Sequence, residues 1–129
     1  MARLKTISLL TLLIFTLTTF GQTKNDRAFG KSFAEQELKS SLQDSLQHNV
    51  IGRIPLIIKD SLMALNLAEP ILFDIYGKNN ITQQRPYEIY LIDNYWVISG
   101  TLRKDWKGGT FLIIIDGRDC RIIRITHGK

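Results

Sequence analysis

The sequence predicts an α+β domain in which helices pack on a curved antiparallel sheet of about four strands. Two changes in hydrophobic period indicate this fold. Between residues 61 and 76, apolar side chains recur about every four residues, as they do along one face of a helix. From Pro86 onward they recur at every second residue, which is the period of a β-strand. The 129 residues suffice for one such domain.

Residues 1–21 are typical of a secretory signal peptide. Two basic residues precede the apolar run Ile7–Phe20, which is shorter and richer in threonine than a membrane span. Thr19 and Gly21 are small residues at the positions that a signal peptidase reads, so we expect cleavage after Gly21. This predicts an exported protein, periplasmic if the source is bacterial, that meets the membrane only through its signal peptide. The alternative is an uncleaved N-terminal anchor.

The charge of the chain argues against a nucleic-acid partner. Cleavage would remove Arg3 and Lys5 and no acid, which lowers the formal charge from +5 to +3. The remaining cations are spread along the chain and do not form one basic cluster. An exported protein would also rarely meet nucleic acid.

Residues 22–53 are predicted to form an N-terminal segment that contains one amphipathic helix. Ser32 is the expected N-cap of this helix, and Leu38, Leu42 and Leu46 recur at four-residue spacing. The apolar stripe is narrow. We therefore expect the helix to lie on a surface.

A second helix is predicted from about Ser61 to Tyr76. Asp60 or Ser61 is the expected N-cap, and Gly77 is expected to end the helix with a positive φ. Pro70 removes a backbone hydrogen bond, which predicts a kink or a restart near Glu69.

Two β-hairpins are predicted after the helices. The first has a two-residue turn at 93–94, which pairs Leu91 with Trp96 and Ile89 with Ile98. The second turns over residues 116–119.

The predicted sheet is apolar on both faces. Residues 111–115 are all apolar, and the face opposite Trp96 carries Tyr90, Ile92, Tyr95 and Val97. An antiparallel sheet that is covered on one side only normally alternates apolar with polar residues. The second face therefore needs a cover, which could be another part of the chain, a ligand, a partner protein, or curvature of the sheet around a pocket.

The residues that could carry chemistry form no recognisable pattern. His48 and His127 have no second metal ligand at helical or hairpin spacing, and both are expected at the surface. Gly108 and Gly109 precede a strand and do not link a strand to a helix, which excludes a phosphate-binding loop and indicates a structural role. Cys120, the single cysteine, is expected to be a small buried or half-buried hydrophobe. We predict no catalytic, cofactor-binding or metal-binding residue.

A basic loop joins the two hairpins. Trp106 lies in it beside the cations Arg103, Lys104 and Lys107. A loop tryptophan flanked by cations is typical of an interface anchor. The alternative is that Trp106 folds back and covers the edge of the sheet.

The run from Ile54 to Lys129 resembles the NTF2 fold immunity proteins of bacterial polymorphic toxin systems. The resemblance rests on short motifs in a fixed order: IP (residues 54–55), AEPIL followed by IYG (68–77), RPY (85–87), YWVISGTL (95–102), GG (108–109) and THGK (126–129). It implies an NTF2-like, cystatin-like domain over residues 54–129. Cys120 departs from it, because a glycine is expected at this point of the turn, and Pro70 is a second departure.

The resemblance also implies a non-enzymatic protein that binds and neutralises a cognate toxin and needs no cofactor. The expected contacts are the concave face of the sheet and the loop 103–107, with the following candidate residues: Tyr90, Tyr95, Arg103, Lys104, Trp106 and Lys107. A homodimer is also possible on this basis. Two alternatives stay open, a small-molecule-binding or enzymatic periplasmic domain of the same fold and an inhibitor of periplasmic hydrolases.

Overall fold

The computed structural model describes residues 28–128. The predicted signal peptide and its cleavage site lie outside these residues. The chain divides into two units, residues 1–39 and 40–129, which are described separately. No helix of the described residues is long and apolar enough to cross a membrane.

Helix α1 spans Gly30–Gln43, and its side chains are all exposed, as the narrow apolar stripe predicts. Two details of the prediction are wrong. Ser32 lies inside the helix and is not its N-cap, and the helix ends before Leu46. The Leu46 amide donates to the Asp44 carboxylate at 3.2 Å, a local turn that competes with another helical turn.

Helix α2 spans Ser61–Tyr76 and begins and ends as predicted. The Asp60 carboxylate accepts a hydrogen bond from the Met63 amide at 2.8 Å and so caps the first turn. Gly77 has a φ of 86° and its amide donates to the Phe73 carbonyl at 3.0 Å. Helix α3, Lys78–Thr82, follows at once and buries Ile81.

Of the kink or restart predicted near Glu69, the restart is wrong, because α2 continues through Pro70. Proline leaves the carbonyl of Asn66 without its helical donor. Asn66 and Pro70 are both exposed, so water can satisfy that carbonyl. The opposite side of the helix is held by Ala68 and Leu72, which are completely buried.

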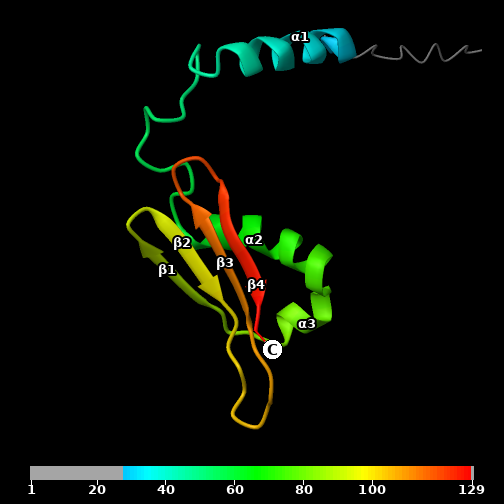
Figure 1. Cartoon of the computed structure of the whole chain (residues 1–129), viewed down its shortest axis with the longest axis vertical. Coiled ribbons are helices and arrows are strands. Elements are labelled where there is room, and N and C mark those ends of the chain that lie inside the picture. Colours follow the sequence, from blue (N-terminus) through cyan, green and yellow to red (C-terminus); the bar gives the residue numbers. More distant parts are fainter. Residues whose placement is uncertain (1–27, 129) are drawn as a thin grey trace, which may run out of the picture. The chain divides into compact units, whose positions relative to one another are not determined.

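Four antiparallel strands form one sheet in the order β1-β2-β3-β4, as the sequence predicts (Figure 1). The strands are β1 Glu88–Ile92, β2 Tyr95–Ser99, β3 Phe111–Asp116 and β4 Ile122–His127. The register of the first hairpin is confirmed, since Leu91 pairs with Trp96 and Ile89 with Ile98. Its turn residues Asp93 and Asn94 have φ values of 46° and 67°, as a tight two-residue hairpin turn requires.

The second hairpin turns slightly later than predicted. Asp116 is still the last residue of β3, and the connection runs over residues 117–121. Cys120 adopts a φ of 64°, the left-handed conformation that favours glycine. The expectation of a glycine at this point of the turn therefore has a physical basis. Cys120 is half-buried against the core, as predicted.

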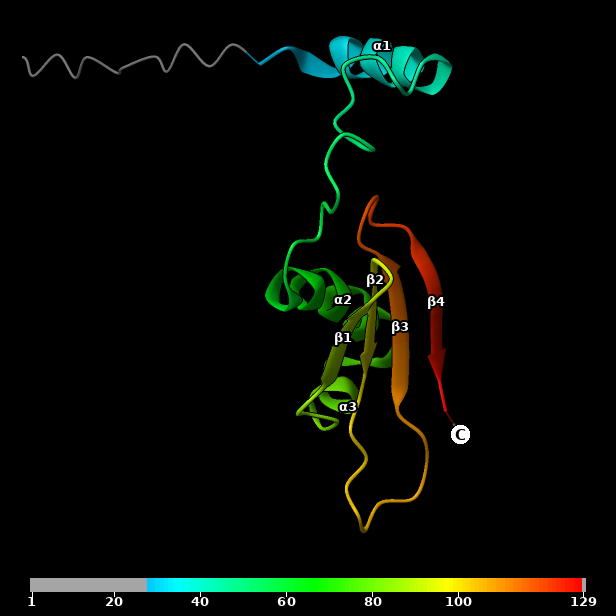
Figure 2. The ribbon, with the colours of Figure 1, turned by 90° about the vertical axis from the view of Figure 1, so that its left-hand side faces the viewer.

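The core lies between α2 and one face of the sheet. Figure 2 shows α2 and α3 on one side of the strands, with no element of residues 40–128 on the other side. The completely buried side chains of this layer come from both elements: Ala64, Ala68 and Leu72 of α2, and Ile98, Phe111 and Ile113 of the sheet. Trp96 joins them, and its indole N–H donates to the Ile58 carbonyl at 3.0 Å. These observations confirm the predicted α+β class.

Candidate protein-binding surface

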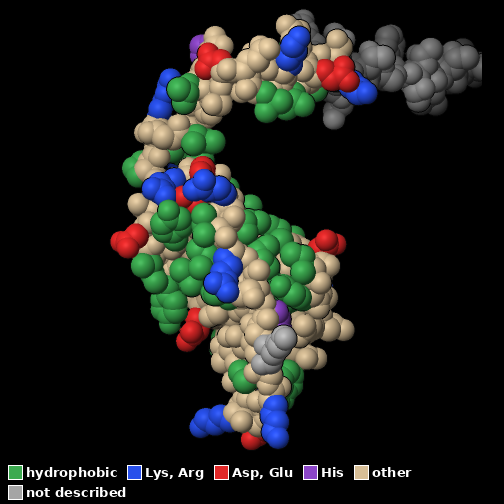
Figure 3. Space-filling view, viewed as in Figure 1, with side chains coloured by type: hydrophobic (Ala, Val, Ile, Leu, Met, Phe, Trp, Pro, Cys, Tyr) green, Lys and Arg blue, Asp and Glu red, His purple; other side chains and the backbone are tan. Residues whose placement is uncertain are grey.

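The face of the sheet that points away from the helices is apolar, and we call it the open face. Strand alternation places on it apolar side chains from β1, β2 and β3, and Arg124 of β4 as the partner of Ile114, while the irregular β3–β4 pairing adds Ile123. The apolar members are Tyr90, Ile92, Tyr95, Val97, Leu112, Ile114 and Ile123. Tyr90 and Ile92 are each 54% exposed. Figure 3 shows hydrophobic side chains gathered over β1 and β2 on this side. The sequence correctly predicts the two-sided apolar sheet, and among the described residues of this unit nothing covers the second side.

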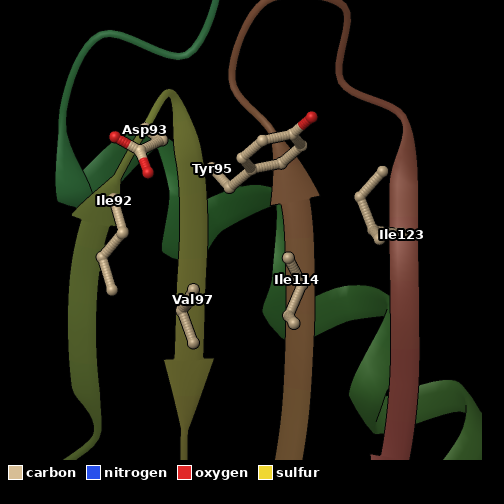
Figure 4. Close-up of a pocket in the computed structure, with 6 residues that line it drawn as sticks. All are labelled: Ile92, Asp93, Tyr95, Val97, Ile114 and Ile123. Atoms are coloured by element: carbon tan, nitrogen blue, oxygen red, sulfur yellow. The ribbon is translucent and has the colours of Figure 1, made fainter.

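A hollow of about 330 Å³ lies on the open face. Five apolar or aromatic side chains and one carboxylate line it (Figure 4): Ile92, Asp93, Tyr95, Val97, Ile114 and Ile123. Ile123 reaches this position at the irregularity in the β3–β4 pairing, where the register shifts between Ile114 and Ile115. The hollow could receive an apolar side chain of a partner or a small apolar ligand.

A charged pair holds Tyr95 in place at one end of the open face. The Asp116 carboxylate is only 1% exposed and accepts hydrogen bonds from Arg118 Nε at 2.9 Å and Nη2 at 2.7 Å. Arg118 Nη2 also donates to the Tyr95 hydroxyl at 2.8 Å, with the guanidinium 5.2 Å from the centre of the ring. These contacts hold the Tyr95 ring in a fixed position.

The same pair sets the protonation of this corner. Hydrogen bonds from the side chain and backbone of Arg118 lower the pKa of Asp116 to about 2. The reciprocal hydrogen bond raises the pKa of Arg118 above its usual value. Both groups are charged at neutral pH, and Arg121 adds a third charge 3.8 Å from the carboxylate. Arg118 was not predicted as a site residue.

The loop of residues 100–110 presents the predicted tryptophan to solvent. Trp106 is 42% exposed, and its ring lies 5.2 Å from the Arg103 guanidinium. The Trp106 amide donates to the Arg103 carbonyl at 3.0 Å, which closes a tight turn. Lys104 and Lys107 are exposed beside it. Trp106 is therefore exposed in its loop, and its role as an interface anchor stays a prediction.

The six predicted contact residues do not form one cluster. Tyr95 begins β2, whereas the loop follows Ser99 at the other end of that strand. Tyr90 pairs with Val97 in the middle of the sheet. In Figure 1 the loop lies below the strands, at the end of the sheet opposite the Asp93–Asn94 turn. The candidates therefore divide into the open face, with Tyr90 and Tyr95, and the loop, with Arg103, Lys104, Trp106 and Lys107.

The glycine pair at the base of the loop is structural, as predicted. A Cβ on Gly109 would lie 2.2 Å from the backbone of Gly128, so only glycine permits this close approach. Gly108 has a φ of 127° and open space around it.

Histidine positions agree with the prediction only in part. His48 is exposed, but His127 is half-buried, and its Nε2 lies 3.1 Å from Nε2 of the buried Gln84. The Gln84 Oε1 accepts from the Phe111 amide at 2.9 Å, and its Nε2 donates to the Asn80 carbonyl of α3 at 3.2 Å, so this network ties α3 to the sheet. In the described part of the chain, no three histidine, cysteine or acidic residues come together to hold a metal ion.

Comparison with known proteins agrees with the resemblance noted above. Residues 63–129 match the family described as NTF2 fold immunity protein. The uncharacterized protein YhhH of Escherichia coli K12 is 30% identical over 122 residues, covering 94% of this chain and 86% of YhhH. The uncharacterized protein YbbC of the same organism is 30% identical over 73 residues, covering 56% of this chain and 60% of YbbC. No solved structure matches.

Proposed function

Because the chain belongs to the NTF2 fold immunity protein family, we propose that it is an exported immunity protein that binds and neutralises a cognate toxin without catalysis. Family membership indicates toxin neutralisation by binding in general terms. The binding surface, the export and the particular toxin belong to the proposal. The observation that carries it is the open face, an ordered apolar surface on the side of the sheet away from the helices.

The open face has the chemistry of an interface. Aromatic residues contribute large contact areas at a small cost in side-chain entropy, and they are enriched among the residues that dominate binding energy. Tyr90 is half-exposed and Tyr95 is held by Arg118. Trp106 and its cations supply a second contact at the far end of the sheet. Exposed apolar surface of this kind on a folded domain marks an interaction site.

Export is supported by the N-terminal sequence. A basic start, an apolar run of signal-peptide length and small residues before Gln22 form the usual pattern of a secreted chain. An exported immunity protein would protect the compartment in which the incoming toxin acts, which in this proposal is the periplasm.

The proposal predicts a toxin gene next to the gene for this chain, and binding to the toxin domain that it encodes is the test. We expect Tyr90→Glu to weaken binding at least about tenfold, because it puts a charge into an apolar contact. The matched control is Ile75→Glu on α2, a residue of similar exposure at 51%. Both variants should melt within a few degrees of the wild type. Wild-type affinity in Tyr90→Glu, or equal losses in both variants, would contradict the assignment of the open face.

The hollow favours one alternative function, that of a small-molecule-binding or enzymatic domain of the same fold. Its volume of about 330 Å³ is at the lower end of the range for ligand sites. Its lining would suit a small apolar ligand with a positive group near Asp93. A rise in melting temperature with such ligands, lost in Ile114→Glu, would favour this alternative.

A further inference from the structure

We propose that the free edge of β1 receives an extended strand of the toxin, which adds a fifth strand to the sheet. This inference rests on the proposed function and specifies how the partner is held. Four observations carry it: the direction of the backbone groups of β1, the lack of protection at this edge, the side chains beside it, and the charges at its ends.

The backbone amides and carbonyls of two β1 residues point outward, away from β2. The Gly100 amide donates to the Phe111 carbonyl at 3.1 Å, so the backbone of Gly100 faces β3. Backbone groups alternate along a strand, and those of Ser99, Val97 and Tyr95 therefore face β1. Their partners in β1 are Glu88, Tyr90 and Ile92, which must face β2.

The intervening residues, Ile89 and Leu91, consequently point their amides and carbonyls away from the sheet. No backbone hydrogen bond from a loop or turn of the described residues reaches these groups. Figure 2 shows β1 as the near edge of the sheet, with no other element of residues 40–128 in front of it. Alternating donors and acceptors at strand spacing are satisfied best by another strand.

The two edges of the sheet differ in their protection. On β4, Arg124 lies within the strand and the pairing with β3 is irregular at Ile114 and Ile115. Charges and bulges of this kind prevent a further strand from pairing. Strand β1 has an unbroken register and no charged residue between Glu88 and its end at Ile92. Only the β1 edge is therefore suited to strand addition.

Side chains beside the β1 edge are apolar on both faces. Tyr90 and Ile92 belong to the open face. Leu91 lies on the helix side but is still 45% exposed, so α2 does not cover the sheet as far as this edge. A strand added here would bury apolar side chains on both faces. It would also continue directly into the surface proposed to bind the toxin.

Charge favours a partner strand over a second copy of this chain. Glu88 and Asp93 lie at the two ends of the apolar segment, and both are exposed. Antiparallel pairing of two copies centred on Tyr90 would bring Glu88 and Asp93 of both copies to one short strand pair, with no basic residue between them. The mutual repulsion of these acids opposes such pairing. The fitting occupant is an extended toxin segment with apolar residues on both faces and a basic residue at each end.

The experiment uses the toxin domain that the proposed function predicts in an adjacent gene, made as an inactive variant, and follows amide exchange in the full complex. We expect the amides of Ile89 and Leu91 to exchange quickly in the free protein and at least about tenfold more slowly in the complex. The amide of Tyr90 faces β2 and serves as an internal control. It should be protected in both states.

A pair of variants separates the backbone from the side chain. Leu91→Pro removes the outward amide, whereas Leu91→Ala removes the same side chain and keeps that amide. Proline should weaken toxin binding about tenfold more than alanine, since it deletes a hydrogen bond at the interface. Should Leu91→Pro fail to fold, the exchange data still decide the question.

Each outcome decides the inference. Protection of Ile89 and Leu91 together with weaker binding by Leu91→Pro supports it. Toxin binding without protection of these amides overturns it and leaves the proposed function standing. No toxin binding by the wild type overturns both. A free protein that sediments as a dimer, and becomes a monomer in Leu91→Pro, overturns the partner strand in favour of a second copy.

Discussion

The two faces of the sheet have similar composition but different surroundings. Ile113 and Ile114 are neighbours in β3, yet Ile113 is completely buried under α2 while Ile114 lies half-buried on the open face. The hydrophobic residues alone do not distinguish a core from an interaction surface. The difference is that α2 packs on one face, where its completely buried side chains include Ala64 and Ala68, whose small size permits close packing.

The largest expected effect contrasts these two isoleucines. Ile113→Ala should lower the free energy of unfolding by about 2–5 kcal/mol, because it leaves a cavity that neighbouring side chains cannot fill. Ile114→Ala should cost less than about 1.5 kcal/mol, since water already reaches its site. Chemical denaturation of both variants measures the difference. Equal losses would mean that the open face is covered in solution.

The second prediction concerns the end of the sheet where the loop returns to β3. Gly109→Ala should lower the free energy of unfolding by about 1–3 kcal/mol, because the new methyl group meets the backbone of Gly128. Gly108→Ala has open space and strains only its positive φ, which should cost about 1 kcal/mol. Thermal unfolding of the two variants measures the difference in their stability. The explanation by close approach is wrong if Gly108→Ala proves the more damaging change.

The third prediction tests the buried charge on the open face. The pKa of Asp116 is depressed from 3.8 to about 2 by Arg118, so its contribution to stability is present above pH 3.8 and is lost as the pH falls toward 2. Asp116→Asn should lower the melting temperature at pH 7. Between pH 4 and pH 2, the melting temperature of this variant should also fall less steeply than that of the wild type. If the melting temperatures of wild type and variant fell in parallel with pH, the ion pair would have no role in acid stability.

The fourth prediction concerns the turn beside that charge. Cys120 holds a left-handed conformation that costs a non-glycine residue about 1 kcal/mol. The variants Cys120→Gly and Cys120→Ala both lack the sulfur, so the difference in their stability reports the cost of the backbone conformation. The glycine variant should be the more stable by about 1 kcal/mol in equilibrium unfolding. An alanine variant of equal stability would show that the turn relaxes without cost.

Features set by neighbouring residues could be predicted from the sequence. The two-residue turn at 93–94 predicts the pairing of Leu91 with Trp96, because the length of the turn fixes the register of a hairpin. The ends of α2 at Asp60 and Gly77 follow from local capping. The restart at Pro70 was wrong because burial of the far side of the helix outweighs one lost hydrogen bond.

Features that join distant segments could not be predicted in the same way. The hydrogen bond from Arg118 to Tyr95 spans 23 positions and depends on the pairing of Tyr95 with Asp116. The contact of Gln84 with His127 spans 43 positions. An acid and an arginine two residues apart in a hairpin turn are a usable signal for the first of these contacts, and the second has no local signal.

The smallest expected effect on stability belongs to the loop. Trp106 packs on Arg103 and is 42% exposed, so Trp106→Ala should cost less than about 1 kcal/mol of unfolding free energy, the value of an exposed cation–π contact. Toxin binding should nevertheless weaken, by about tenfold if the indole is buried at the interface. A loss in binding much larger than the loss in stability is what separates an interaction surface from a core. A large loss of stability with unchanged binding would instead make Trp106 a structural residue and leave the open face and the β1 edge as the candidate surfaces.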